Sequence, residues 1–180
     1  MSRIAPLLIL PALLAAPRPA RAGMRMTLVA LDAQELAEAR KDPSRVDRIL
    51  ESDRPGALDL DKAWHGIHYL LAGTAWTPGK GAGQVILGGT PLGGDQGYGP
   101  ARFFSVGEVR LLAGLLEAET PAKLTARFDA KAMDREKIYP DVWVREGKEA
   151  LDYLLEYYVQ LVAFYKAAAK ADRAVLFVVD

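Results

Sequence analysis

Two strongly apolar runs of β-forming residues lie near opposite ends of this chain, at residues 24–31 (MRMTLVAL) and 174–179 (AVLFVV). Runs this dense in Val, Leu and Phe are typical of strands that are buried on both faces. Each run therefore needs neighbouring strands beside it and helices above and below it. We expect the two runs to pair in a small central sheet surrounded by helices, which is an α+β fold.

Helix signals fill most of the sequence between these two strands. Two Asp- or Ser-led capping boxes and one Thr-Pro start predict helix beginnings, and apolar residues at helical period predict a long C-terminal helix. The expected helices cover residues 33–41, 44–50, 59–72, 105–119, 120–128 and 146–171. Residues 142–144 (VWV) are expected to be extended, and the glycine-rich residues 73–99 to form a long loop with one short regular piece at 84–87.

Residues 1–22 have the pattern of a secretory signal peptide: a positive start, an apolar run and an Ala-Arg-Ala end. The apolar run is too short to cross a bilayer, which needs about 20 residues, so no stable membrane span is expected. Two interpretations are open. The chain is exported, to the periplasm or outside the cell, or its translation starts near Met24 and it is cytoplasmic. In both cases a single domain is expected over residues 23–180.

Charge and cysteine content exclude several classes of protein. The chain has 23 Lys plus Arg and 23 Asp plus Glu, and without the three arginines of residues 1–22 the balance is 20 against 23. Such a chain lacks the clustered positive charge that binds nucleic acid. It contains no cysteine, which excludes thiolate nucleophiles, disulfides and zinc–sulfur sites.

Trp64 and His68 lie on the apolar stripe of the helix expected at 59–72, so a core histidine that donates to a main-chain carbonyl is the ordinary interpretation of His68. A polar pocket role is the alternative. His65 and His68 are the only histidines, and they lack the spacing frame of a zinc protease helix. We therefore expect no metal and no cofactor.

Tyr98 is flanked by glycine on both sides and followed by proline. Glycine permits backbone angles that other residues avoid, and proline fixes φ, so this pattern specifies the direction of one ring. We expect Tyr98 to point toward the end of the helix at 59–72, so that Tyr98, His68 and Arg102 border one pocket with Asp95 in its polar rim. The alternative is that Tyr98 fills a hole in the core.

The segments DLDKAWHGIHYLLAG, GGxxxGxDxGYGPAR and IYPxxW, together with a Tyr-rich helix and a last apolar strand, resemble the YfbM-like family. This is a bacterial family of small domains of unknown function. The resemblance covers residues 23–180 and implies an α+β fold without an established activity. The landmarks that this chain shares with the family are Asp61, Lys62, Trp64, His68, Gly73, Tyr98, Gly99, Pro100, Tyr139, Pro140 and Trp143.

The sequence favours a non-catalytic binding or protein-interaction module, with an immunity-type role as one version. Its partner would be an unknown protein or a small polar ligand, held by the glycine-rich loop and an aromatic pocket. The candidate binding residues are Trp64, His68, Asp95, Tyr98, Arg102, Tyr139 and Trp143. The alternative is a small hydrolase or other enzyme, with His68, Asp95 and Arg102 as its acid–base set. A purely structural role is a third hypothesis.

Overall fold

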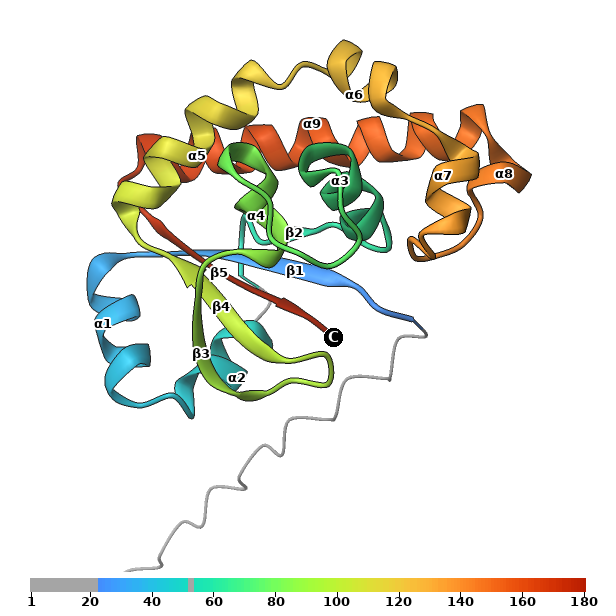
Figure 1. The fold of residues 1–180 in the computed structure, drawn as a ribbon. Coiled ribbons are helices and arrows are strands. Elements are labelled where there is room, and N and C mark those ends of the chain that lie inside the picture. The colour runs from blue at the N-terminus through green and yellow to red at the C-terminus, as the bar shows by residue number, and fades with distance from the viewer. Residues whose placement is uncertain (1–22, 52–53) are drawn as a thin grey trace, which may run out of the picture.

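The structure is a computed structural model that describes residues 23–51 and 54–180, so the expected signal at residues 1–22 lies outside the described residues. The described residues form a five-stranded sheet with the strand order β2-β1-β5-β4-β3 (Figure 1). Every neighbouring pair of strands is antiparallel. The strands are β1 (Met26–Leu31), β2 (Leu58–Asp59), β3 (Thr90–Asp95), β4 (Pro100–Phe104) and β5 (Ala174–Val179).

The expected pairing of the two apolar runs is confirmed. β1 and β5 pair over their full lengths, from Met26 opposite Val179 to Leu31 opposite Ala174. β5 is the middle strand of the sheet, and its first five residues are buried. A strand in that position has neighbours on both edges and helices on both faces, which is why its sequence is apolar throughout.

Helices cover both faces of the sheet (Figure 1). The helices α1 (Ala33–Lys41) and α2 (Arg45–Glu51) pack on one face, where β5 contributes Leu176 and Val178 to the core. The larger layer lies on the other face, where β5 contributes Val175 and Phe177. That layer contains α3 (Ala63–Ala72), α4 (Gln84–Leu87), α5 (Val106–Ala118), α6 (Pro121–Arg127), α7 (Ala130–Arg135), α8 (Trp143–Glu146) and α9 (Lys148–Lys170).

The helix starts that the capping patterns predict are present. Asp32 begins α1 with a capping box, in which the main-chain N–H of Glu35 donates to Asp32 over 2.8 Å and Glu35 accepts from the N–H of Asp32 over 2.9 Å. Ser105 and Glu108 form the same motif at α5. The long C-terminal helix α9 has 23 residues. None of the helices in residues 23–51 and 54–180 is both long enough and apolar enough to cross a membrane.

Three local expectations are wrong. α3 begins at Ala63, because residues 58–59 pair with β1 as a short strand. Residues 142–144 are not extended, since Trp143 begins the helical turn α8 and its ring is buried. The glycine-rich region contains β3, whose Pro91 and two glycines are poor strand formers. A proline is tolerated there because β3 is an edge strand of the sheet.

Candidate functional site

The aromatic residues that the sequence singles out on α3 and α8 belong to the core. Trp64 is 1% exposed and Trp143 is fully buried. Their indole N–H groups donate to main-chain carbonyls, from Trp64 to Met24 over 3.2 Å and from Trp143 to Ile138 over 2.6 Å. The expected aromatic pocket is therefore not formed by these two rings, because both are buried in the main hydrophobic core.

His65, on α3, is fully buried and is not among the expected binding residues. Its Nε2 atom lies 2.7 Å from the carbonyl oxygen of Ala75, and its Nδ1 atom lies 3.0 Å from the main-chain nitrogen of Tyr139. The N–H of Tyr139 can only donate, so Nδ1 accepts and Nε2 carries the proton. Burial lowers the pKa of His65, and the ring is therefore a neutral bridge between α3 and two loops.

His68 is also fully buried, but neither of its ring nitrogens has a hydrogen-bond partner within the described residues. Burial is the main cause that lowers its pKa to about 4, and the nearby His65 lowers it further. The main chain of Thr77 acts in the opposite direction, although no ring nitrogen of His68 meets it in hydrogen-bond geometry. The core position is as expected, whereas the expected bond to a carbonyl is not formed.

Asp59 and Asp61, the acidic residues before α3, form ion pairs and a hydrogen bond with residues distant in the sequence. The guanidinium group of Arg25 pairs with Asp59 over 2.5 Å and with Asp61 over 2.8 Å. The hydroxyl group of Tyr153, on α9, donates to Asp61 over 3.1 Å. Neither Asp59 nor Asp61 caps α3, since no side chain forms a capping hydrogen bond at the start of that helix. These carboxylates instead tie β2 to β1 and α9.

Asp95 and Tyr98 lie at the tip of the hairpin that joins β3 and β4. One carboxylate oxygen of Asp95 accepts hydrogen bonds from the N–H groups of Gly97 and Gly99, each over 2.9 Å. These bonds lower the pKa of Asp95. The side chain of Gln96 donates to Asp47 of α2 over 2.8 Å, which ties the tip to the face of the sheet opposite α3. The Tyr98 ring is 62% exposed.

Arg102 holds the other end of that hairpin. Its Nε and Nη2 atoms donate to the carbonyl oxygens of Gly88 and Gly89, over 2.5 and 2.8 Å, at the end of α4. His68, Asp95 and Arg102 thus lie in three different surroundings and form no acid–base set. The expected pocket of Tyr98, His68 and Arg102 is not formed, because the Gln96–Asp47 bond holds the Tyr98 loop on the α2 side.

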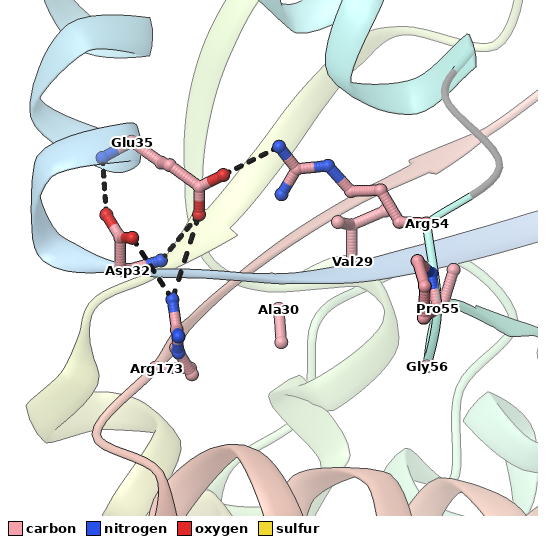
Figure 2. Close-up of a pocket in the computed structure, with 9 residues that line it drawn as sticks. Val29, Ala30, Asp32, Glu35, Arg54, Pro55, Gly56 and Arg173 are labelled. Atoms are coloured by element: carbon pink, nitrogen blue, oxygen red, sulfur yellow. Dashed lines mark hydrogen bonds and ion pairs between the residues drawn. The ribbon is translucent and has the colours of Figure 1, made fainter.

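A cavity of about 480 Å³, here called the edge cavity, opens beside β1 next to the turn that precedes β2 (Figure 2). None of its residues is among the expected binding residues. The signal in the sequence that points to it is Arg54-Pro55-Gly56, a turn pattern directly before β2 that keeps this strand short. The cavity is lined by Val29, Ala30, Asp32, Glu35, Arg54, Pro55, Gly56, Ala57 and Arg173.

Two carboxylates and two guanidinium groups face one another in the edge cavity (Figure 2). Glu35 pairs with Arg54 over 2.6 Å, and Arg173 lies 3.2 Å from Asp32 and 3.9 Å from Glu35. The bond from Arg54 lowers the pKa of Glu35. The main-chain N–H of Glu35 and the charge of Arg173 lower the pKa of Asp32. Both carboxylates therefore stay ionised at neutral pH.

The described residues contain no group of three or more His, Cys, Asp or Glu side chains that could hold a metal ion. The edge cavity supplies only two carboxylates, and each already pairs with an arginine. What this arrangement offers a ligand is a set of fixed charges of both signs.

Comparisons with known proteins give a family and a fold. The family described as domain of unknown function DUF1877 matches residues 22–178. The crystal structure of YfbM from Escherichia coli, titled a protein of unknown function, is 20% identical to this chain with a TM-score of 0.73. The match covers 87% of this chain and 99% of that chain, and at this identity it shows the fold alone. No curated protein matches the chain.

Proposed function

This chain belongs to the DUF1877 family of domains of unknown function, and on that premise we propose that it is a non-catalytic binding module that takes a small polar ligand in the edge cavity. The observation that carries the proposal is the cavity itself. Its volume of about 480 Å³ lies within the range of roughly 300–1,000 Å³ found for small-molecule sites. Ionised side chains that already hold one another in place line it.

Fixed charges support binding because they need no rearrangement when a ligand arrives. Glu35 holds Arg54, while Asp32 and Glu35 hold Arg173. Charges in fixed positions favour ligands with a complementary arrangement of charge and disfavour others. Both signs are present side by side, so the cavity suits a compound that carries polar groups of both kinds.

Catalysis has less support from the same residues. A general acid or base works best when its pKa lies near the pH at which the enzyme operates. Asp32 and Glu35 have lowered pKa values, and the histidines, whose ordinary pKa lies nearest neutrality, are buried in the core. The enzyme hypothesis also needs His68, Asp95 and Arg102 together, and they are apart.

The test is a binding screen on the full chain with small polar compounds, namely amino acids, short peptides, sugars and nucleotides, followed by NMR. We expect some compounds to shift the signals of cavity residues and to bind roughly tenfold more weakly to Arg173→Gln. The matched control is Arg145→Gln, which removes an exposed arginine paired with Glu146 on α8. Equal binding to both variants, or turnover of a bound compound, contradicts the proposal.

A protein-interaction surface at Tyr98 is a second candidate function, and an immunity-type role belongs here. The specific observation is that Asp95 fixes the hairpin tip while the Tyr98 ring stays 62% exposed. Exposed tyrosines on preorganised loops are common anchors in protein interfaces, since little freedom is lost on binding. The tether from Gln96 to Asp47 adds to that rigidity.

A photo-crosslinking amino acid placed at position 98 in the native host tests this second candidate. We expect one partner to be captured at position 98 and not at Val144, an exposed apolar residue on α8 that serves as the control. The idea is wrong if positions 98 and 144 capture the same background proteins.

A further inference from the structure

The main-chain groups of β1 alternate between its two neighbouring strands. Arg25 and Asp180 exchange two main-chain hydrogen bonds, over 2.8 and 3.0 Å. In an antiparallel pair every second residue repeats this exchange, so Thr27, Val29 and Leu31 bond to β5. The residues between them turn their N–H and C=O groups toward β2. The bond from the N–H of Leu60 to the carbonyl of Met26, over 2.8 Å, shows this orientation.

β2 is too short to meet the last of these outward-facing residues. Leu28 lies opposite Leu58, where β2 begins. Continued by two residues, that register would bring Gly56 opposite Ala30. Residues 54–57 form a turn instead, in which the N–H of Ala57 donates to the carbonyl of Arg54 over 3.1 Å and Gly56 has φ of +81°. Proline followed by glycine with positive φ is typical of a type II turn.

The main-chain N–H and C=O of Ala30 therefore face the edge cavity. No hydrogen bond joins them to residues 54–57, and Ala30 is only partly buried. A Cβ added at Gly56 would meet no other residue within 4 Å, so the space beside the turn is open. An unpaired strand edge is a template for pairing with another extended chain.

Arg173 also lines the edge cavity, and only one of its guanidinium nitrogens is used in the ion pairs described above. Its Nη1 atom approaches Asp32 and Glu35, whereas no hydrogen bond of its Nε and Nη2 atoms occurs in the described part of the chain. The Nε and Nη2 atoms lie on one edge of the guanidinium group, and their two N–H groups match the two oxygens of a carboxylate. An arginine fixed on one side and free on the other is thus preorganised for such a ligand.

We propose that the edge cavity binds a short extended peptide segment that carries a carboxylate. The main chain of the segment pairs with Ala30 as one added rung of the sheet, and its carboxylate binds Nε and Nη2 of Arg173. This rests on the proposed function of the cavity as a binding site and names its ligand class. A free C-terminus and an Asp or Glu side chain both supply the required carboxylate.

Four synthetic peptides test the proposal on the full ¹⁵N-labelled chain. The first is acetyl-trialanine with a free C-terminus, and the second is its C-terminal amide. The third is acetyl-Ala-Asp-Ala-amide, and the fourth is the free acid with N-methylated alanine at its centre. The amide signal of Ala30 and the Nε signal of Arg173 are followed by NMR as each peptide is added.

We expect the first peptide, the third, or both to shift the two signals and to saturate. Which of them does so identifies the source of the carboxylate. The uncharged amide and the N-methylated peptide are expected to bind roughly tenfold more weakly. Equal binding of the amide removes the role of the carboxylate, and equal binding of the N-methylated peptide removes the main-chain pairing. Either result overturns the proposal.

Variants separate this inference from the proposed function. Arg173→Gln is expected to weaken the best peptide roughly tenfold, while Arg145→Gln leaves its affinity unchanged. A melting curve checks that each variant is folded. If other small compounds shift the cavity signals but no peptide moves the Ala30 amide, the cavity is a binding site and the peptide inference is wrong. If no compound or peptide shifts them, both are wrong.

Discussion

His65 accepts a hydrogen bond from the main-chain N–H of Tyr139 over 3.0 Å, across 74 positions of sequence. Its other ring nitrogen donates to Ala75. One turn further along α3, His68 is equally buried and has neither bond. His65 thus links α3 to two loops through hydrogen bonds, whereas His68 makes none. Substitution of His65 should therefore lower the stability of the protein much more than substitution of His68.

His65→Phe is expected to destabilise the protein strongly. The change leaves the N–H of Tyr139 and the carbonyl of Ala75, both partly buried, without these partners, at a cost of up to roughly 1–3 kcal/mol for each group. His68→Phe removes only unpaired nitrogens, so its effect at pH 7 should be within about 1 kcal/mol or stabilising. Denaturant unfolding of both variants measures the difference. Similar losses for the two would contradict the assigned roles.

Stability is expected to fall between pH 6.5 and 4. The pKa of folded His68 is lowered from 6.5 to about 4, so the unfolded chain binds this proton first as the pH drops. The stabilisation from neutral His68 is complete above pH 6.5 and is lost progressively down to pH 4, by about 3 kcal/mol. His65 acts in the same direction. When the free energy of unfolding is plotted against pH across this range, its slope should be shallower for His68→Phe than for the unchanged chain. An unchanged slope would show that His68 does not cause this pH dependence.

Gly66→Ala and Gly114→Ala should change stability in opposite directions. A Cβ on Gly66 would lie 2.6 Å from the Trp143 ring and 2.7 Å from Leu154, inside the core. Such overpacking costs about 1–3 kcal/mol. Gly114, on α5, has no atom within 4 Å of the added Cβ, so the gain in helix propensity of about 0.5–1 kcal/mol remains. The melting temperature should therefore fall in Gly66→Ala and rise in Gly114→Ala. A shift in the same direction for both variants would contradict the prediction.

Trp64→Ala is expected to cost about 3–5 kcal/mol, as for other buried aromatic side chains. The ring is 1% exposed and hydrogen-bonded to Met24. Trp76→Ala is the control, because Trp76 is 58% exposed and contacts the outside of His65 at a ring distance of 4.2 Å. Its loss should stay below about 1 kcal/mol, as is usual for a surface position.

Residues 1–22 are proposed either to direct export or to precede a true translation start near Met24, and in both cases a chain that begins at Gly23 should keep the full stability of the fold. The first strand begins at Met26, and the family match begins at residue 22. A loss of more than about 1 kcal/mol would show that the segment packs on the core. N-terminal sequencing of the protein from its native host distinguishes cleavage before Gly23 from a start at Met24.

Much of the fold could be predicted because its signals are local. The capping boxes at Asp32 and Ser105 specify helix starts through side chains three positions apart. β3 could not be predicted, since its pairing with β4 overrides the weak strand preference of Pro91 and its glycines. The start of α3 was missed for a related reason: residues 58–59 pair with a strand thirty positions earlier in the sequence.

The site was harder to predict, because the edge cavity joins residues from three separate segments, 29–35, 54–57 and Arg173. Burial of Trp64 and His68 follows from their helical spacing. The position of Tyr98 depends instead on the bond between Gln96 and Asp47, which no local pattern encodes. The edge cavity exists because the turn at residues 54–57 leaves Ala30 of β1 without a neighbour on the β2 side, and Arg173 lies beside it because β5 pairs with β1.

The central place of β5 also determines when this protein can fold. β1 with β2, and β4 with β3, are two separate ribbons until residues 174–179 enter between them. β5 follows β1, β2, β3 and β4 in the sequence, so the nascent chain keeps two unpaired strand edges until residues 174–179 have been synthesised. The sheet is therefore expected to close only after β5 has been synthesised, and a chain cut before Ala174 is expected to leave the edges of β1 and β4 unpaired and to aggregate.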